Sequence, residues 1–262
     1  MNINDISTQL LYTTVPIYAE KKDHQISSGT GFIFSIQETD NASIPLLITN
    51  YHVLEDAIAG FIEFHIGEKG LPTKKTIKIQ FDNSIVNSNK LGSLDLIAIP
   101  LASTLNNLQN RNVEIFYRSV DSKMIPSLEQ RDGFGAIEDI TFIGYPSGLY
   151  DNENKTPLIR QGITATPIWN KFKGEDVFLV DAGVFPGSSG SPVFIFNQGA
   201  YPTSNGISIG NRLFFVGIIS QTILRDENTH KNFLNLGKVI NSISFDKEIN
   251  IFISNLKKMQ NN

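Results

Sequence analysis

The sequence contains no cysteine among its 262 residues. Without thiols there is no disulfide framework, no thiolate nucleophile, no cysteine-ligated zinc and no iron–sulfur cluster. It also contains no apolar run of about 18 residues, which a membrane-spanning helix would need. The first ten residues, MNINDISTQL, lack the basic start and the apolar stretch of a secretory leader. We therefore expect a cytoplasmic protein with no membrane partner.

Blocks of positive charge are also absent. Lys and Arg number 22 against 26 Asp and Glu, which gives a net charge of −4. Nucleic acid is therefore not expected as a partner. Hydrophobic residues make up 40% of the chain and charged residues 18%. This composition supplies a sizeable core, and the length suits one large domain or two small ones.

Most apolar segments are short, rich in Ile, Val and Phe, and separated by Gly, Pro, Asn, Asp or Ser. Residues 61–66 and 76–81 alternate between apolar and polar positions, which predicts half-buried strands. Many short strands with few helical spacers favour antiparallel sandwiches or barrels over a parallel sheet. The other predicted strands are 15–19, 30–36, 45–49, 94–99, 138–144, 158–167, 176–182, 191–196 and 212–223.

Two segments depart from the strand pattern. Residues 101–134 are more polar and less periodic, which predicts a linker with a short surface helix at 103–110. Near the end of the chain, apolar residues recur at helical spacing, with Asp246 placed to cap the helix start. The pattern predicts a helix and tail over 246–262, packed on the body. The apolar positions are Ile249, Phe252, Ile253, Leu256 and Met259.

Residues 187–192, GSSGSP, are the most informative stretch. A serine held in a tight glycine turn between strands has an exposed hydroxyl, and successive backbone N–H groups can converge there on a developing oxyanion. Ser189 is therefore a candidate nucleophile. The alternative is an ordinary hairpin turn rich in small residues.

A serine needs a neighbouring base to accept its proton. We interpret His24, His65 and His230 as solvated surface residues, because polar residues or a polar strand face surround each one. His52 differs, because it comes just past the apolar run 45–48. A hydrogen-bonded core histidine is the alternative for His52.

Such a base is usually oriented by a buried carboxylate. Asp95 is a lone acid at the start of the apolar run 94–99, where burial without a partner would be costly. The alternative is a strand-edge aspartate that faces water. Asp181 is a rival acid, but its position just upstream of Ser189 suits it better to brace that loop.

The order His52, Asp95, Ser189 resembles that of the trypsin-like (chymotrypsin-fold) serine peptidases. The chain is most similar to bacterial HtrA-like and glutamyl-endopeptidase-like members, without a PDZ domain. The resemblance extends over most of the chain and is carried by several segments in the expected order. These are TGFIF, LLITNYHVL, LDLIAIPL, FIGYPSG, RQGITA, VDAGVFPGSSGSPVF and VGIISQT.

The resemblance implies an all-β fold of two packed antiparallel β-barrels with a C-terminal helix. The first barrel would occupy residues 1–100 with His52 and Asp95, 101–134 would be the inter-barrel linker, and 135–245 would form the second barrel with the nucleophile. It also implies a serine endopeptidase that cleaves peptides or proteins through an acyl-enzyme. The backbone N–H groups of Gly187 and Ser189 would form the oxyanion hole.

The sequence departs from some relatives in ways that bear on activation and specificity. Ser188 stands where secreted digestive members carry an aspartate, so activation by zymogen cleavage is not expected. By similarity, Gly183 would be the base of the substrate pocket. It supplies no carboxylate for Arg or Lys, and Ile219 replaces the histidine of glutamyl endopeptidases, so a small or medium apolar side chain is expected. Ser220, Gln221 and Thr222 would form one wall of this pocket.

Two other functions are compatible with the same resemblance. A peptide-binding scaffold would keep the cleft without catalysis, and an esterase would turn over small molecules only. No metal or organic cofactor is implied. A freely active cytoplasmic endopeptidase would be hazardous, so we expect narrow specificity, a regulatory protein partner or a serine loop ordered only on demand.

Overall fold

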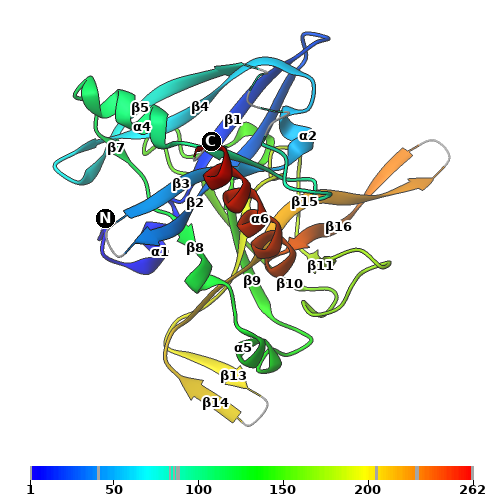
Figure 1. Ribbon diagram of the computed structural model, residues 1–262. Coiled ribbons are helices and arrows are strands. Elements are labelled where there is room, and N and C mark those ends of the chain that lie inside the picture. The colour runs from blue at the N-terminus through cyan, green and yellow to red at the C-terminus, as the bar shows by residue number, and fades with distance from the viewer. Residues whose placement is uncertain are drawn as a thin grey trace.

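The computed structural model describes residues 2–39, 42–82, 84, 86, 89–203, 206–227 and 230–260, and gives only the backbone for 224–227, 230–233 and 259–260. The chain forms a β-sheet from its first half and a β-barrel from its second half, and a long C-terminal helix packs on the body (Figure 1). No helix in the described part of the chain is long and apolar enough to span a membrane.

The first half forms an eight-stranded sheet with the order β5-β4-β1-β2-β3-β6; β7 pairs with β4, and β8 pairs in parallel with β2. Alternation selects the buried face, so that Ile62 and Phe64 of β4 enter the core. The strands are β1 (Thr14–Lys21), β2 (Ile26–Thr39), β3 (Ala42–Thr49), β4 (Ala57–Glu68), β5 (Leu71–Asp82), β6 (Ile97–Pro100), β7 (Ile115–Phe116) and β8 (Val120–Asp121).

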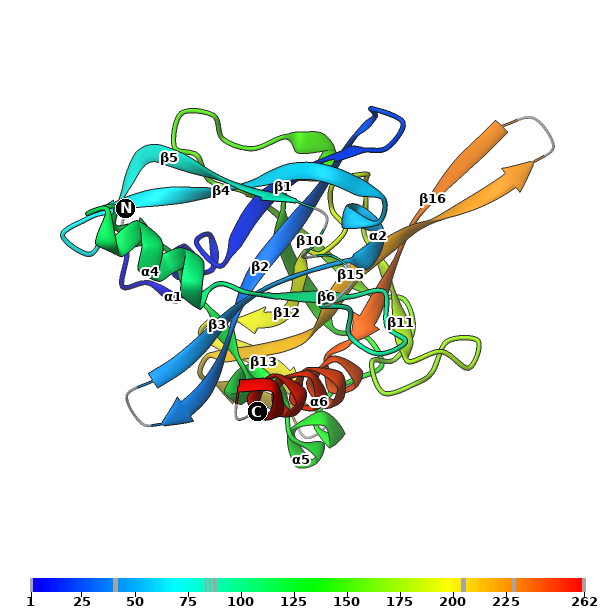
Figure 2. The ribbon, with the colours of Figure 1, turned by 45° about the horizontal axis from the view of Figure 1, so that its top comes forward.

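The second half forms a closed antiparallel barrel with the order β10-β11-β16-β15-β12-β9. Beyond the barrel, β15 and β16 continue as a long two-stranded hairpin (Figure 2), and β13 and β14 form a separate pair. The strands are β9 (Asp139–Gly144), β10 (Leu158–Thr164), β11 (Val177–Asp181), β12 (Pro192–Asn197), β13 (Ala200–Thr203), β14 (Gly206–Ile209), β15 (Arg212–Glu227) and β16 (His230–Asn241).

The predicted fold class, mostly antiparallel β with a C-terminal helix, is confirmed. The two halves differ in closure, because the hydrogen-bonded path of the first sheet starts at β5 and ends at β6, whereas that of the second returns on itself. The helical elements are α1 (Ile6–Leu10), α2 (Tyr51–Leu54), α4 (Ala102–Asn110), η1 (Ser122–Met124), α5 (Leu128–Asp132), η2 (Pro146–Gly148) and α6 (Ser242–Gln260).

Helix α6 packs where the two halves meet. Phe245 of α6 meets Phe34 of β2 edge-on at 4.9 Å between ring centroids, and Phe215 of β15 at 5.8 Å. All three rings are fully buried, and burying each contributes about 1.5–3 kcal/mol. The helix therefore ties the first sheet to the barrel through a shared aromatic core.

The start of α6 corrects one prediction. The helix begins at Ser242, so the expected cap, Asp246, lies inside it. Asn241 takes the capping role, because its Oδ1 accepts a hydrogen bond from Ile243 N at 2.9 Å. Of the predicted apolar face, Ile249 and Ile253 are buried; Met259 lies outside the described side chains.

The predicted surface helix at 103–110 is confirmed as α4. After it, β7 and β8 add to the first sheet, so part of the 101–134 segment joins the first half by hydrogen bonds. Where the chain enters the barrel, Glu138 pairs with Arg212 at 2.5 Å, and both side chains are only 7% exposed. Losing one member of such a pair would cost about 3–5 kcal/mol.

The prediction that His65 is a solvated surface residue is wrong. Its side chain is buried, and its ring meets that of Tyr12 edge-on at 5.1 Å. His65 Nδ1 lies 3.2 Å from the carbonyl oxygen of Thr73. The alternation places His65 opposite Phe64, but other parts of the chain cover that face of β4.

Candidate active site

A histidine and an aspartate from adjacent strand ends form the centre of the site. Strand β3 pairs with β6, which brings α2, just after β3, next to the bend before β6. His52 Nδ1 lies 2.7 Å from Asp95 Oδ2, and His52 N donates to Asp95 Oδ1 at 3.0 Å. The side chains are 39% and 32% exposed, so a substrate can reach the imidazole.

Asp95 lies just before β6 instead of inside the strand, and a set of donors fixes it there. Asn50 Nδ2 and Tyr51 N donate to its backbone oxygen at 2.8 and 3.2 Å. Ser220 Oγ donates to Asp95 Oδ2 at 3.1 Å. Burial raises the pKa of Asp95, but the hydrogen bonds from His52 and Ser220 and the charge of the imidazolium outweigh burial, so the pKa is lowered.

Ser220 connects Ser189 to the His52–Asp95 pair. Ser189 Oγ donates to the backbone oxygen of Ser220 at 3.0 Å, while the Ser220 hydroxyl contacts Asp95. Within the described residues, the Ser189 hydroxyl makes no hydrogen bond to His52. Rotation about the Ser189 Cα–Cβ bond is the movement that would redirect the hydroxyl.

Two glycines shape the loop that carries Ser189. Gly187 and Gly190 both have φ of +89°, a conformation that other residues rarely adopt. A Cβ on Gly190 would lie 1.9 Å from the backbone oxygen of Thr30, so only glycine fits there. Between them, Ser188 is buried, and its Oγ accepts a hydrogen bond from Phe185 N at 3.3 Å. Ser188 therefore braces its own loop.

Thr30 of β2 holds this loop from the first sheet. Its Oγ1 donates to Gly187 O at 2.9 Å and accepts from Tyr145 N at 3.0 Å. Its backbone N donates to Ser189 O at 2.8 Å. Sequence reasoning missed Thr30, although it begins the TGFIF segment, because its partners lie more than a hundred positions away.

The N–H groups of Gly187 and Ser189 were predicted to face an oxyanion. Within the described part of the chain, neither N–H donates to another protein group. Beside them, Ser147 N donates to Pro186 O at 2.5 Å. The 144–148 turn therefore packs directly against the serine loop and fixes the Pro186 carbonyl away from these two donors.

The four predicted pocket residues fall in two places. Gly183 follows β11, whereas Ser220, Gln221 and Thr222 lie in β15. Ser220 contacts Asp95 and Ser189, a role that its predicted place in a pocket wall does not include. Asp181, the rival acid, ends β11 in an exposed position, and the carboxylate that pairs with His52 is that of Asp95.

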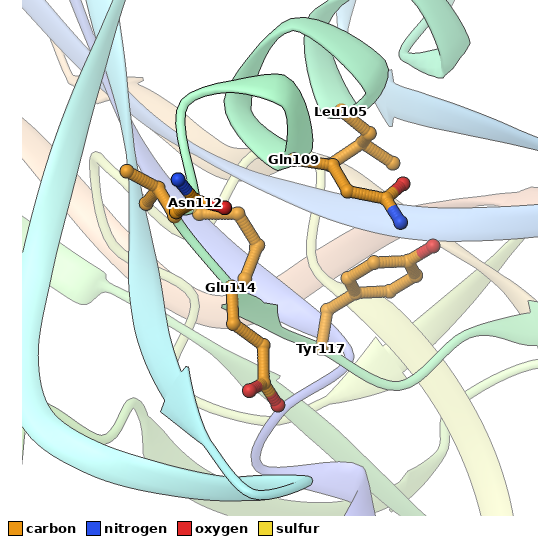
Figure 3. Close-up of a pocket in the computed structure, with 7 residues that line it drawn as sticks. Leu105, Gln109, Asn112, Glu114 and Tyr117 are labelled. Carbon is orange, nitrogen blue, oxygen red and sulfur yellow. The ribbon is translucent and has the colours of Figure 1, made fainter.

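A cavity of about 470 Å³ lies away from these residues, between α4 and β7 (Figure 3). Leu105, Gln109, Glu114 and Tyr117 are among its lining residues. Glu114 Oε1 accepts a hydrogen bond from Gly70 N at 2.8 Å, so this carboxylate fixes the β4–β5 turn. None of the catalytic candidates lines this cavity.

Comparison with known proteins agrees with this geometry. Residues 29–200 match the trypsin-like peptidase domain family, and this stretch includes all three catalytic candidates. An inactive serine-to-alanine mutant of Rv3671c from M. tuberculosis H37Rv is 14% identical with a TM-score of 0.50, over 97% of this chain and 92% of that chain. A serine endoprotease from Yersinia pestis is 16% identical with a TM-score of 0.52, over 97% and 67%.

At these identities the likeness concerns the fold, which is chymotrypsin-like. No curated protein sequence matches the chain.

Proposed function

Because the chain belongs to the trypsin-like peptidase family, we propose that Ser189, His52 and Asp95 form the catalytic triad of this serine endopeptidase. Its substrates are peptides or proteins. The observation that carries the assignment is the contact between His52 Nδ1 and Asp95 Oδ2, at 2.7 Å, beside the serine loop.

The chemistry follows from the roles that these groups can play. With Asp95 accepting from Nδ1–H, the other imidazole nitrogen is left free to accept the Ser189 proton. Ser189 Oγ attacks the peptide carbonyl, His52 then gives the proton to the leaving amine, and an acyl-enzyme forms. Water attacks the acyl-enzyme with His52 again as the base, which releases the acid and restores the serine.

The negative charge that develops on the carbonyl oxygen needs donors. The unpaired N–H groups of Gly187 and Ser189 support an oxyanion hole at this position. Removing one such donor costs other hydrolases about 10²–10³ in turnover. Asp95 supports the imidazolium by its charge, and its lowered pKa means that it stays ionised while His52 carries the extra proton.

One observation favours a second candidate function, an idle peptide-binding cleft. The Ser189 hydroxyl is hydrogen-bonded to the Ser220 carbonyl, away from the base. We assign this contact to the resting enzyme, because rotation about the Ser189 Cα–Cβ bond would release the hydroxyl from the Ser220 carbonyl. An enzyme locked in this state would bind peptides without cleaving them.

The test compares the wild type, Ser189→Ala and the control variant Ser254→Ala, whose serine is exposed on α6. A fluorophosphonate should label the wild type and the control but not Ser189→Ala. Peptide hydrolysis should fall by about 10⁶-fold in Ser189→Ala alone. Circular dichroism checks that each variant is folded.

The possible contrary results separate the alternatives. Folded wild type that is not labelled would support the idle cleft. Labelling with turnover of esters but of no peptide in a proteome-derived library would support the esterase. Equal peptide turnover by Ser189→Ala would contradict the triad assignment.

A further inference from the structure

An arginine lies at the predicted base of the substrate pocket. A Cβ built on Gly183 would lie 2.6 Å from Arg160 Nη2, so the guanidinium fills the space into which a side chain at position 183 would project. Arg160 belongs to β10 and pairs with Phe142 of β9, which places its side chain on the inward face of the barrel. The guanidinium thus reaches this loop from inside the barrel.

No anionic side chain among the described residues pairs with the guanidinium. It stacks on the ring of Phe185, with Arg160 Cζ 5.1 Å from the centroid. Within the described residues, the Arg160 side chain has no hydrogen-bond or ion-pair partner. Asp181, the acid closest to Gly183 in sequence, ends β11 in an exposed position. Arginine remains charged at any physiological pH and offers a planar set of donors to a carboxylate.

Neighbouring strands connect the Gly183 loop to the strand that contacts Ser189. A Cβ on Gly237 would lie 2.5 Å from Val184 Cγ2, so β16 packs closely on the residue after Gly183. Gly237 pairs with Thr222 of β15. Two residues earlier in β15, the carbonyl of Ser220 accepts from Ser189 Oγ. A series of neighbouring residues therefore connects the Gly183 loop, which Arg160 contacts, to the strand that holds the Ser189 hydroxyl.

Strand β15 also contains a second polar group with no partner among the described residues. Thr222 Oγ1 is buried and, among the described residues, makes no hydrogen bond. An unpaired buried hydroxyl is costly unless a ligand or water supplies its partner. The guanidinium is the group that indicates an anionic ligand, because a cation beside Gly183 without an anionic partner among the described residues fits an anionic side chain better than an apolar one.

We propose that Arg160 is the specificity residue of this enzyme, and that its guanidinium binds the carboxylate of a Glu or Asp whose own backbone carbonyl Ser189 attacks. This inference rests on the proposed function and replaces the apolar preference expected from Gly183 and Ile219. The missing side chain at Gly183 leaves room for the arginine, which comes from a different strand.

The test uses peptides that differ only in the residue on the amino side of the cleaved bond: Glu, Asp, Gln, Leu or Lys. The value of kcat/KM is normalised to the fraction labelled by fluorophosphonate. Glu or Asp should exceed Gln by about 100-fold, because Gln matches Glu in shape but not in charge. A proteome-derived peptide library, read by mass spectrometry, identifies the preferred residue independently.

Variants assign the preference to one side chain. Arg160→Gln should lower kcat/KM for the acidic peptide by about 100-fold and leave that for the Gln peptide within about threefold. Arg160→Glu should favour the Lys peptide. Arg111→Gln removes an exposed arginine after α4 and should change neither value.

Each contrary result has a distinct meaning. Equal or better cleavage after Leu by the wild type, or an unchanged Glu preference in folded, labelled Arg160→Gln, would overturn the role of Arg160 and leave the peptidase assignment intact. If Arg160→Gln does not fold, the wild-type preference in the library decides the substrate class. Absence of both labelling and cleavage in the wild type would instead contradict the proposed function.

Discussion

The hydroxyl of Ser220 donates a hydrogen bond to the carboxylate of Asp95 at 3.1 Å, across 125 positions of the chain. Ser220 belongs to the barrel, whereas Asp95 lies in the first half of the chain, just before β6. The carbonyl of the same serine accepts from Ser189 Oγ at 3.0 Å. Ser220 therefore joins the nucleophile to the acid. Relative displacement of the two halves would break its contact with Asp95, whereas Ser189 lies in the same half as Ser220 and would keep its own contact.

The first prediction concerns this hydroxyl. Ser220→Ala keeps the backbone oxygen but removes one of the hydrogen bonds that hold Asp95 ionised and oriented. A hydrogen bond to a charged group contributes about 1.5 kcal/mol or more, so kcat/KM should fall by about 10-fold while fluorophosphonate labelling persists at a lower rate. Steady-state kinetics measures kcat/KM of Ser220→Ala, with Ser254→Ala as the control variant. Equal values of kcat/KM for the two variants would show that the Ser220–Asp95 contact does not support catalysis.

The second prediction concerns the glycine after the nucleophile. Gly190 and Gly174 both have positive φ, but a Cβ meets Thr30 O at 1.9 Å in the first case and nothing within 4 Å in the second. Backbone strain should cost Gly174→Ala about 1–2 kcal/mol. Gly190→Ala should lose at least about 3 kcal/mol, because it adds a clash between main chains. Urea unfolding of both variants measures the difference.

The same pair of variants separates folding from function. Gly174→Ala should keep wild-type labelling of Ser189, whereas Gly190→Ala should lose it even at temperatures where the protein is folded. Similar unfolding free energies for the two variants would contradict the close approach of the serine loop to β2.

The third prediction uses the buried histidine. Burial lowers the pKa of His65, and the backbone oxygens of Thr73 and Lys155, which favour the charged form, only partly offset it. The neutral form is therefore favoured in the folded state. The stability that this adds is complete above the unfolded pKa of about 6.5 and is lost as pH falls toward the lower folded pKa.

His65→Gln removes this titration and retains an amide that can donate to Thr73. Between pH 7 and 5, the unfolding free energy of the wild type should fall more steeply than that of the variant, by up to about 1.4 kcal/mol per pH unit. Urea unfolding at several pH values measures both slopes. If the unfolding free energies of the wild type and the variant changed equally with pH, protonation of His65 would not destabilise the folded protein.

Local patterns predicted much of the architecture. Alternating apolar residues located β4 and β5, the helical spacing located α6, and the glycine turn located the serine loop, because each signal depends on neighbours in sequence. Strand β16 was missed, because its sequence, HKNFLNLGKVIN, is largely polar. It is held in place by pairing with β11 and β15, and those partners are not visible in its own sequence.

Long-range contacts explain the remaining differences. The alternation of β4 correctly opposed His65 to Phe64, but no local signal showed that Tyr12 and Thr73 would cover the histidine. In the same way, the RQGITA segment gives no indication that Arg160 reaches Gly183. The sequence identified candidate groups for the chemistry; the fold supplied the neighbours that orient them.

The dependence of the serine loop on Thr30 also bears on the protein's synthesis. Thr30 is synthesised before Gly187, whose carbonyl it binds and which follows 157 positions later, and Ser220 comes later still. A chain that stalls before β15 is made lacks the residue that links nucleophile and acid. A polypeptide that ends before β15 would therefore lack both contacts of Ser220, the one to Ser189 and the one to Asp95.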